Sequence, residues 1–205
     1  MGSSRVQVIC PTCKTVFLPT IKEVQSRAGA SARRKGHAFE RKVAKQLQDW
    51  WNTNREQKCE FRRSPQSGGS ALKVGFRMFG DVVSNASDFI FGIECKNAPG
   101  SYAGLHQFLS AEKFVFWNWL EQATGDCPKD AVSWIIFTRY DQPTLCASIH
   151  GSFSCGIMYT LDTANLDYFI FHSNKRNVSI IIWKFDDMIK TSPDVWKWPE
   201  NRKHC

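Results

Sequence analysis

The sequence has no apolar run of the ~18 residues that a membrane-spanning helix needs, and its first residues lack the pattern of a secretory signal peptide. It also contains no internal repeat. Its eight cysteines are scattered, and only Cys10 and Cys13 form a close pair. A secreted disulfide scaffold would be shorter and denser in cysteine. We therefore expect a cytoplasmic protein, in the host cytoplasm if a virus encodes it, without membrane contact and with most of its cysteines reduced.

The sequence does contain enough apolar material for one domain of ordinary size. Its 205 residues are 42% hydrophobic and include 15 Phe and 8 Trp. The formal net charge is +8, which favours polyanionic partners, nucleic acid first. A merely basic protein would show the same charge, so this observation alone leaves both interpretations open.

Apolar periodicity predicts a helix over residues 37–51, because Phe39, Val43, Leu47 and Trp50 recur at steps of four and three. A second helix is expected over 104–124, and a terminal helix beginning at 186. A short knuckle or hairpin is expected over 8–20. Runs of apolar residues between turn residues predict strands, and these cover residues 58–63, 80–83, 88–97, 131–140, 155–161, 168–172 and 178–185.

This order of elements predicts an α/β fold with a mixed central β-sheet flanked by helices. We divide the chain into a short N-terminal extension, residues 1–30, and a main domain, residues 31–205. The extension contains the Cys10–Cys13 knuckle and leads into a polar, basic stretch around Arg27 and Arg34. That stretch is either an arm that contacts DNA or a solvated linker.

The strand over 88–97 ends in charged residues. Alternation along a strand places Glu94 and Lys96 on one face and Cys95 on the other, with the Cys95 carbonyl free for a ligand. If this strand pairs with the one before it as a hairpin, Asp81 comes close to Glu94. Two carboxylates beside a lysine suit a hard divalent cation, which helps to hydrolyse phosphodiesters. The simpler explanation of Glu94 and Lys96 is a structural salt bridge.

Four segments in order, RRKGHAFERKVAKQL, FRRSPQSGG, GDVV and IECKN, resemble the archaeal-type Holliday junction resolvases of the PD-(D/E)xK nuclease superfamily. The resemblance runs from about Arg33 to Asn97 and continues more weakly through the following helix and the strand WIIFTR. It implies a restriction-endonuclease-like core and a homodimer that makes paired nicks. It also implies a role in DNA recombination and repair.

The resemblance assigns roles to residues at matching positions. Asp81 and Glu94 match the metal ligands, and Lys96 matches the catalytic lysine. Glu40 matches the acidic residue that completes the metal site directly or through water. A serine near the scissile phosphate corresponds to Ser67. Glu40 could instead be an ordinary surface glutamate, and Ser67 could serve only the turn.

Basic residues fall where the family contacts the DNA backbone, namely Arg33, Arg34, Lys35, Arg62 and Arg63. The chain departs from the family between residues 67 and 81, where the resolvases are much shorter. This insertion adds Lys73 and Arg77 as further donors to DNA. It puts junction specificity in doubt but leaves the cleavage chemistry intact.

Cys10 and Cys13 have the spacing of half a zinc site. A structural Zn²⁺ usually takes four ligands from two such pairs, and no second C-x-x-C is present. Partners could come from Cys127, from His204 with Cys205, or from another subunit. A metal-free hairpin is the alternative.

We therefore expect a Mg²⁺-dependent endonuclease, with Mn²⁺ as a substitute ion, that binds branched DNA and resolves four-way junctions. Two rivals remain at this level. One is a restriction-like or repair nuclease that cuts duplex or flapped DNA. The other is a non-catalytic DNA-binding protein in which the charged residues form structural pairs.

Overall fold

The computed structural model describes residues 8–9, 16–17, 21–64, 79–98, 115–125, 127, 131–139, 143–150, 154–173 and 177–197. Two small strands and a long helix come first, namely β1 (Val8–Ile9), β2 (Val16–Phe17) and α1 (Ile21–Trp51). The other strands are β3 (Phe61–Arg63), β4 (Val82–Ser84), β5 (Phe91–Ala98), β6 (Val132–Arg139), β7 (Leu145–His150), β8 (Tyr168–Ser173) and β9 (Val178–Lys184). The remaining helices are α3 (Val115–Gly125), α4 (Ser154–Thr163), α5 (Phe185–Met188) and the 3-10 turn η1 (Pro193–Trp196).

Seven of these strands form one sheet in the order β3-β4-β5-β6-β7-β9-β8. Strands β5 and β6 are parallel, with Glu94 opposite Ile135 and Lys96 opposite Phe137, and every other pairing in this sheet is antiparallel. The predicted α/β fold with a mixed central sheet is therefore confirmed. Strand β5 lies inside the sheet, and its buried residues run without a break from 91 to 95.

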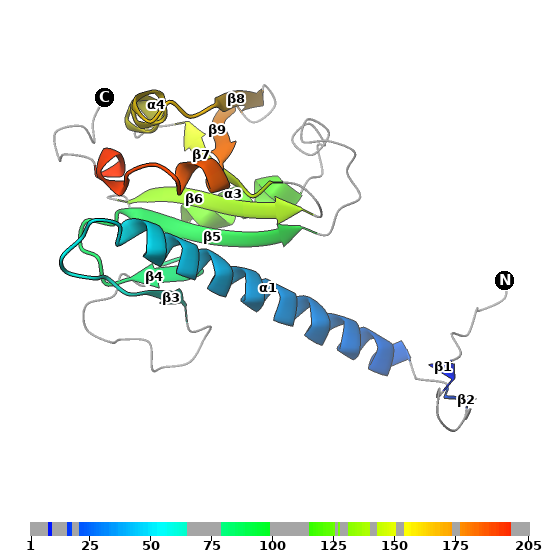
Figure 1. Ribbon diagram of the computed structural model, residues 1–205. Coiled ribbons are helices and arrows are strands. Elements are labelled where there is room, and N and C mark those ends of the chain that lie inside the picture. The colour runs from blue at the N-terminus through cyan, green and yellow to red at the C-terminus, as the bar shows by residue number, and fades with distance from the viewer. Residues whose placement is uncertain are drawn as a thin grey trace.

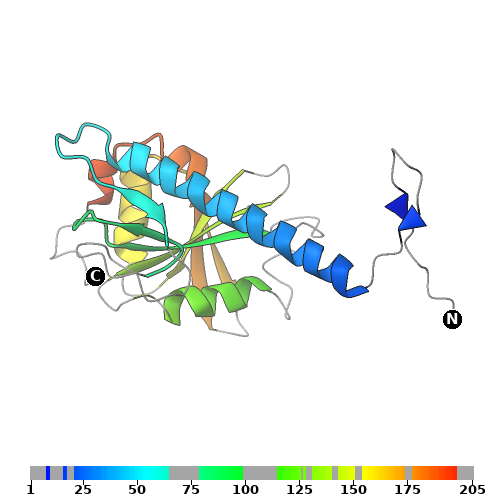
Figure 2. The same cartoon turned by 90° about the horizontal axis from the view of Figure 1, so that it is seen from below.

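Helices cover both faces of the sheet, with α1 on one side and α3 on the other (Figures 1 and 2). The face under α1 also carries α4, α5 and η1, because their buried residues share one apolar cluster. The α3 face has a second cluster, in which Phe116 and Leu120 pack on Ile135 and Ile182. The alternation of β5 follows this division, since Phe91, Ile93 and Cys95 belong to the cluster under α1.

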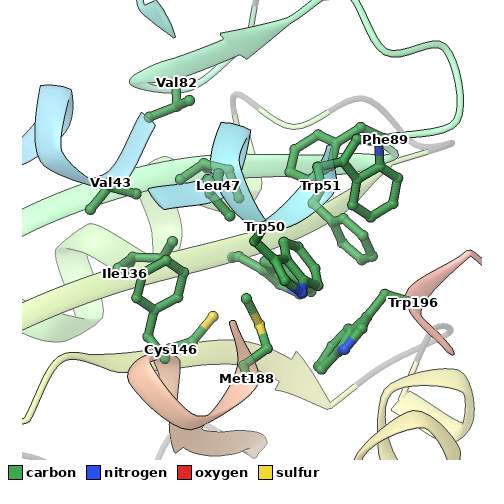
Figure 3. Packing of buried hydrophobic residues seen from close by; sticks show 14 of the residues in the cluster. Val43, Leu47, Trp50, Trp51, Val82, Phe89, Ile136, Cys146, Met188 and Trp196 are labelled. Atoms are coloured by element: carbon green, nitrogen blue, oxygen red, sulfur yellow. The ribbon is translucent and has the colours of Figure 1, made fainter. Parts of the chain in front are cut away.

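The core under α1 is rich in tryptophan. Figure 3 shows Val43 and Leu47 of α1 above the sheet, with Trp50, Trp51 and Trp196 close by. Trp196 lies edge-on to Trp50, with ring centroids 6.2 Å apart, and the Trp50 indole donates a hydrogen bond to the carbonyl of Thr191 at 2.9 Å. These contacts fasten the end of α1 to the C-terminal part of the domain. The predicted amphipathic stripe of this helix is confirmed.

Helix α1 begins at Ile21, well before the expected start near residue 37, and its N-terminal half extends beyond the sheet (Figures 1 and 2). Residues 21–36 lack an apolar stripe, so the sequence alone indicates an arm or a linker here. They contain several Ala, Arg and Lys residues, which favour helix, and a helix that is already nucleated adds such residues readily. The boundary that we predict between residues 30 and 31 therefore lies within α1, and the domain division stays a prediction. None of the described helices is long and apolar enough to cross a bilayer.

The expected strand over 155–161 is wrong, since these residues belong to helix α4. Ile157, Tyr159 and Leu161 alternate in sequence as in a strand, but Ile157 and Leu161 are fully buried whereas Tyr159 is 55% exposed. Burial at 157, 160 and 161 follows the helical repeat instead. Strand β7 was not predicted, and it takes the place in the sheet beside β6.

The other expected elements are found near their predicted positions. The hairpin near the N-terminus is confirmed by the antiparallel pairing of β1 with β2. Helix α3 covers the end of the predicted 104–124 helix, and residues 104–114 lie outside the described residues. The terminal helix appears as α5, which begins one residue before the expected start.

Candidate active site

Asp81 lies directly before β4 and is held by hydrogen bonds to both neighbouring strands. Its amide donates to the Ile93 carbonyl at 2.6 Å, and its own carbonyl accepts from the Ser64 amide at 2.7 Å. Its carboxylate Oδ2 accepts from the Cys95 amide at 2.8 Å. The predicted hairpin of β4 with β5 is confirmed by the pairing of Val82 with Ile93. The side chain of Asp81 thereby continues the hydrogen bonding between β4 and β5 where the backbone pairing ends.

Gly80 makes this position of Asp81 sterically feasible. Its φ is +79°, in the region that glycine alone adopts at little cost. A Cβ atom at this position would also collide with the Ile93 backbone, at 3.0 Å from Ile93 N. The Gly80–Asp81 dipeptide therefore allows the chain to turn closely against β5 and to present the carboxylate.

Glu94 and Lys96 lie on the α3 face of β5 and form an ion pair between Lys96 Nζ and Glu94 Oε1. Their side chains are 6% and 19% exposed, so the pair is largely shielded from solvent. Lys96 Nζ also donates a hydrogen bond of 3.2 Å to Oε1 of Gln122 on α3. The predicted placement of Glu94 and Lys96 on one face is confirmed, and it brings the lysine against α3.

Glu40 approaches from the other helix. It is 7% exposed and pairs with Arg63 of β3, at 2.5 Å between Glu40 Oε2 and Arg63 Nε. It is therefore not an ordinary surface glutamate. Burial raises the pKa of Asp81, and the nearby charge of Glu40 raises it further, whereas the Cys95 amide, Lys96 and Arg63 act in the opposite direction. These charges all act on the Asp81 carboxylate. Asp81, Glu40, Arg63 and Lys96 therefore form one electrostatic cluster.

Cys95 contributes its backbone to this cluster and its side chain to the core. Its amide binds Asp81, while its thiol is buried in the apolar cluster under α1. Burial raises the pKa of this thiol well above its usual value, and the charges of Asp81, Glu40 and Glu94 add to the shift. The thiol is therefore neutral, as expected for a buried cysteine, and metal binding through the Cys95 carbonyl stays a prediction.

The donor set suits a hard cation, since Glu40, Asp81 and Glu94 offer carboxylate oxygens. Within the described part of the chain, no group of three or more His, Cys, Asp or Glu side chains is already placed to hold a metal ion. Two of these carboxylates are instead engaged by basic side chains, since Arg63 binds Glu40 and Lys96 binds Glu94. A cation could recruit both glutamates only by displacing or sharing these basic partners.

A small pocket lies on the α3 face beside this cluster. Its lining includes Gly80, Gly92, Glu94, Ala123 and Cys127. Gly92 permits the close packing here, because a Cβ atom on it would lie 2.9 Å from the Phe79 ring and 3.1 Å from Cys127 Sγ. The pocket therefore forms an opening between the sheet and α3, on the face of β5 that carries Glu94.

The remaining predicted site residues are only partly covered. Arg34 and Lys35 are exposed on α1, and Arg62 and Arg63 are half-buried on β3. Arg33 lies within α1, but its side chain is not among those described. The other predicted residues lie outside the described residues, and their roles stay predictions: Ser67, Lys73 and Arg77 for DNA, and Cys10 and Cys13 for zinc.

Gln122 is the site residue that sequence reasoning missed. It lies on α3, 26 residues after Lys96, and it reaches Lys96 because α3 packs across β5 and β6. Its position near the end of a helix gives no local signal, so only the packing of α3 could reveal the contact.

The sequence model of one protein family, described as "Phage putative PDDEXK endonuclease", matches residues 31–197. Searches of curated proteins and of solved structures each found no match. The matched range covers more than half of the chain and includes Glu40, Asp81, Glu94 and Lys96. Together with the mixed sheet, this match confirms the restriction-endonuclease-like fold. It supports the superfamily that the motifs indicated and carries no information on four-way junctions.

Proposed function

Since the chain belongs to the phage PDDEXK endonuclease family, we propose that it is a metal-dependent endonuclease that hydrolyses phosphodiester bonds in branched DNA and resolves four-way junctions. One observation carries the proposal. The Asp81 carboxylate is fixed against the Cys95 amide, immediately beside the shielded Glu94–Lys96 pair. Acidic oxygens that meet a lysine at the end of a strand are the groups that phosphodiester hydrolysis requires.

In this proposal Asp81 and Glu94 hold the cation, with Glu40 and the Cys95 carbonyl completing its ligands. Mg²⁺, or Mn²⁺ in its place, supplies polarisation of the phosphate and acidification of a water molecule. The raised pKa of Asp81 supports this assignment, because a carboxylate kept from solvent beside another carboxylate is stabilised by an added positive charge. Asp81 is partly buried, and among the described residues its carboxylate accepts a hydrogen bond from the Cys95 amide and not from a basic side chain, which a generic structural ion pair would not require.

Lys96 acts on the nucleophile and on the phosphate. Its ammonium group carries three donors. Among the described residues, Glu94 and Gln122 take two of them, which leaves the third for a water molecule or a phosphate oxygen. Held in this way, the lysine orients the attacking water and stabilises the charge that develops on the phosphate. Ser67 is assigned to contact the scissile phosphate.

The junction preference and the homodimer rest on the motif order RRKGHAFERKVAKQL, FRRSPQSGG, GDVV and IECKN and on the net charge of +8. A four-way junction needs two nicks, and two copies of one site would make them together. Basic residues next to the site, among them Arg34, Lys35 and Arg62, would bind phosphates without regard to sequence. Cleavage of duplex or flapped DNA is the alternative within the same chemistry.

The test is a cleavage assay on a four-way junction, a flap and a linear duplex of equal sequence, with Mg²⁺, with Mn²⁺ and with EDTA. Metal-dependent cutting that strongly favours the junction supports the whole proposal. Equal cutting of the duplex overturns the junction preference but keeps the nuclease. An absence of metal-dependent cutting on every substrate overturns the catalytic assignment in favour of a DNA-binding protein.

A further inference from the structure

The outer face of α1 carries a stripe of basic side chains. Arg34, Arg41 and Lys45 follow one another at spacings of seven and four, and Lys35 and Lys42 lie beside them at a spacing of seven. Such spacings return to the same side of a helix. All five side chains are exposed, and that of Lys45 is 78% exposed. The buried positions of the helix, such as Val43 and Leu47, face the opposite direction.

Acidic residues barely compensate this basic stripe. The described side chains of α1 include two acids, Glu40 and Asp49. Glu40 points inward to Arg63, and Asp49 pairs with Lys45 at 3.4 Å. No ion pair joins Arg34, Lys35, Arg41 or Lys42 to another side chain in the part of the chain that the structure describes.

The stripe is therefore unlike an ordinary solvated helix face, which mixes charges of both signs. Arg41 and Lys45 are like charges four residues apart, an arrangement that weakens a helix by itself. A polyanion bound on this face would attract these side chains and offset their mutual repulsion. The charge pattern thus identifies the chemistry of the partner, a row of phosphates.

The stripe is also placed to reach DNA that enters the site. Glu40, on the inner side of the same helix, belongs to the electrostatic cluster of Asp81. The N-terminal half of α1, which includes Arg34 and Lys35 of the stripe, extends past the C-terminal ends of β5 and β6, the part of β5 that carries Lys96 (Figure 1). From residue 34 to residue 45 the helix rises by about 17 Å. That length matches about five base pairs of duplex.

We propose that the basic stripe, Arg34, Lys35, Arg41, Lys42 and Lys45, binds the phosphate backbone of a DNA arm that flanks the cleavage site. Arg34 and Lys35 were predicted to contact DNA, and the structure adds Arg41, Lys42 and Lys45 on the same face. The contacts are electrostatic and independent of base sequence. The proposal rests on the proposed function, because it takes DNA as the substrate.

The test measures DNA binding apart from cleavage. Wild-type protein and the double variant Arg41→Gln/Lys42→Gln are titrated in EDTA against a labelled duplex and a four-way junction at several salt concentrations. Gln keeps the helix propensity of these exposed positions. We expect the slope of log affinity against log salt to fall by about 1.8, since each lost phosphate contact removes about 0.9. At low salt the affinity should fall about tenfold.

The matched control is Lys184→Gln/Lys190→Gln, which likewise removes two positive charges, near Asp187, at exposed positions at the end of β9 and just after α5. Its salt slope should equal that of wild type. If the α1 variant, folded as judged by circular dichroism, keeps the wild-type slope, the stripe is not the binding surface. In that case metal-dependent cleavage by the wild type would leave the proposed function standing. If the wild type neither binds nor cuts DNA, both proposals fail.

Discussion

The backbone amide of Cys95 donates a hydrogen bond to Oδ2 of Asp81 across the end of the β4–β5 pairing. An acidic side chain therefore takes the position that a backbone carbonyl would occupy if the pairing of these strands continued. The register of the two strands decides where this carboxylate lies relative to Glu94 and Lys96. Any change that preserves an oxygen at this point should preserve the local fold while altering the chemistry.

Asp81→Asn is expected to abolish cleavage and to leave DNA binding largely intact. The Asn carbonyl oxygen can still accept from the Cys95 amide, but the charge that would hold a cation is lost. We expect the rate of junction cleavage in Mg²⁺ to fall at least ~100-fold. Binding in EDTA should stay within about threefold of wild type. Cutting by this variant at the normal rate would overturn the role of Asp81.

The same substitution should alter the pH dependence of stability in metal-free buffer. Burial, with Glu40, raises the folded-state pKa of Asp81 above its unfolded value. The stability that this group contributes is therefore fully present below the unfolded pKa, about 4, and is lost as the pH rises through the raised folded pKa. The Asp81→Asn variant has no titrating group at this position and so does not lose this stability. The free energy of unfolding of the variant minus that of wild type should therefore be larger at pH 7 than at pH 3. Denaturant unfolding of both proteins at both pH values measures this difference. If the difference is the same at pH 3 and pH 7, the pKa of Asp81 is not raised.

Lys96 should be needed for the chemical step. Both Lys96→Ala and Lys96→Gln remove the ammonium group, and we expect cleavage to fall about 100-fold or more. The Gln amide can still donate to Glu94, whereas Ala removes the basic partner of this buried carboxylate. The Ala variant should therefore unfold more easily, by up to about 3 kcal/mol, while both lose activity to the same extent. If Gln restores activity as well as stability, the lysine has only a structural role.

Gln122→Ala should slow cleavage about tenfold without weakening DNA binding, because Gln122 helps to position Lys96 Nζ. Single-turnover rates at saturating protein separate this effect on the chemical step from an effect on affinity. Asn118→Ala is the matched control, since Asn118 is an exposed amide one turn earlier on α3. Equal rates for the two variants would remove Gln122 from the site.

Gly80→Ala tests whether the backbone turn positions Asp81. The positive φ and the collision with the Ile93 backbone should cost about 2 kcal/mol or more of stability and displace Asp81, lowering cleavage. Gly36→Ala on α1 is the control, because a Cβ there lies 3.9 Å from the nearest atom, Glu40 Oε1. That change should stabilise the protein by about 0.5–1 kcal/mol, since Ala favours helix. Thermal unfolding and cleavage rates measure both.

Much of the fold could be predicted because local patterns agree with the tertiary structure. Phe39, Val43, Leu47 and Trp50 repeat with the helical period and are all buried. The apolar run through Phe91 and Ile93 predicts a strand, and the structure places this strand, β5, inside the sheet. The mistake at α4 arose because Ile157 and Leu161, four residues apart, fit both the helical and the strand period over a short run. Only the packing of Ile157 and Leu161 against the core distinguishes the two.

The candidate site, like the fold, could be predicted only in part from the sequence. The order of residues along β5 was enough to place Glu94 and Lys96 on one face and the Cys95 thiol on the other, because side chains alternate in every strand. The partners of these residues depend on elements that are distant in the chain. Arg63 meets Glu40 across 23 residues, and Gln122 meets Lys96 across 26.

The sequence by itself determined the types of charged residue, their faces and their order, since these depend on backbone geometry over a few residues. The tertiary structure decided which charges meet. Glu40 proved to be buried against Arg63, Lys96 to lie against α3, and the basic residues of α1 to line its outer side. The reason is physical: a charge pair between distant segments follows from how the helices pack on the sheet. That packing is set by the whole apolar core.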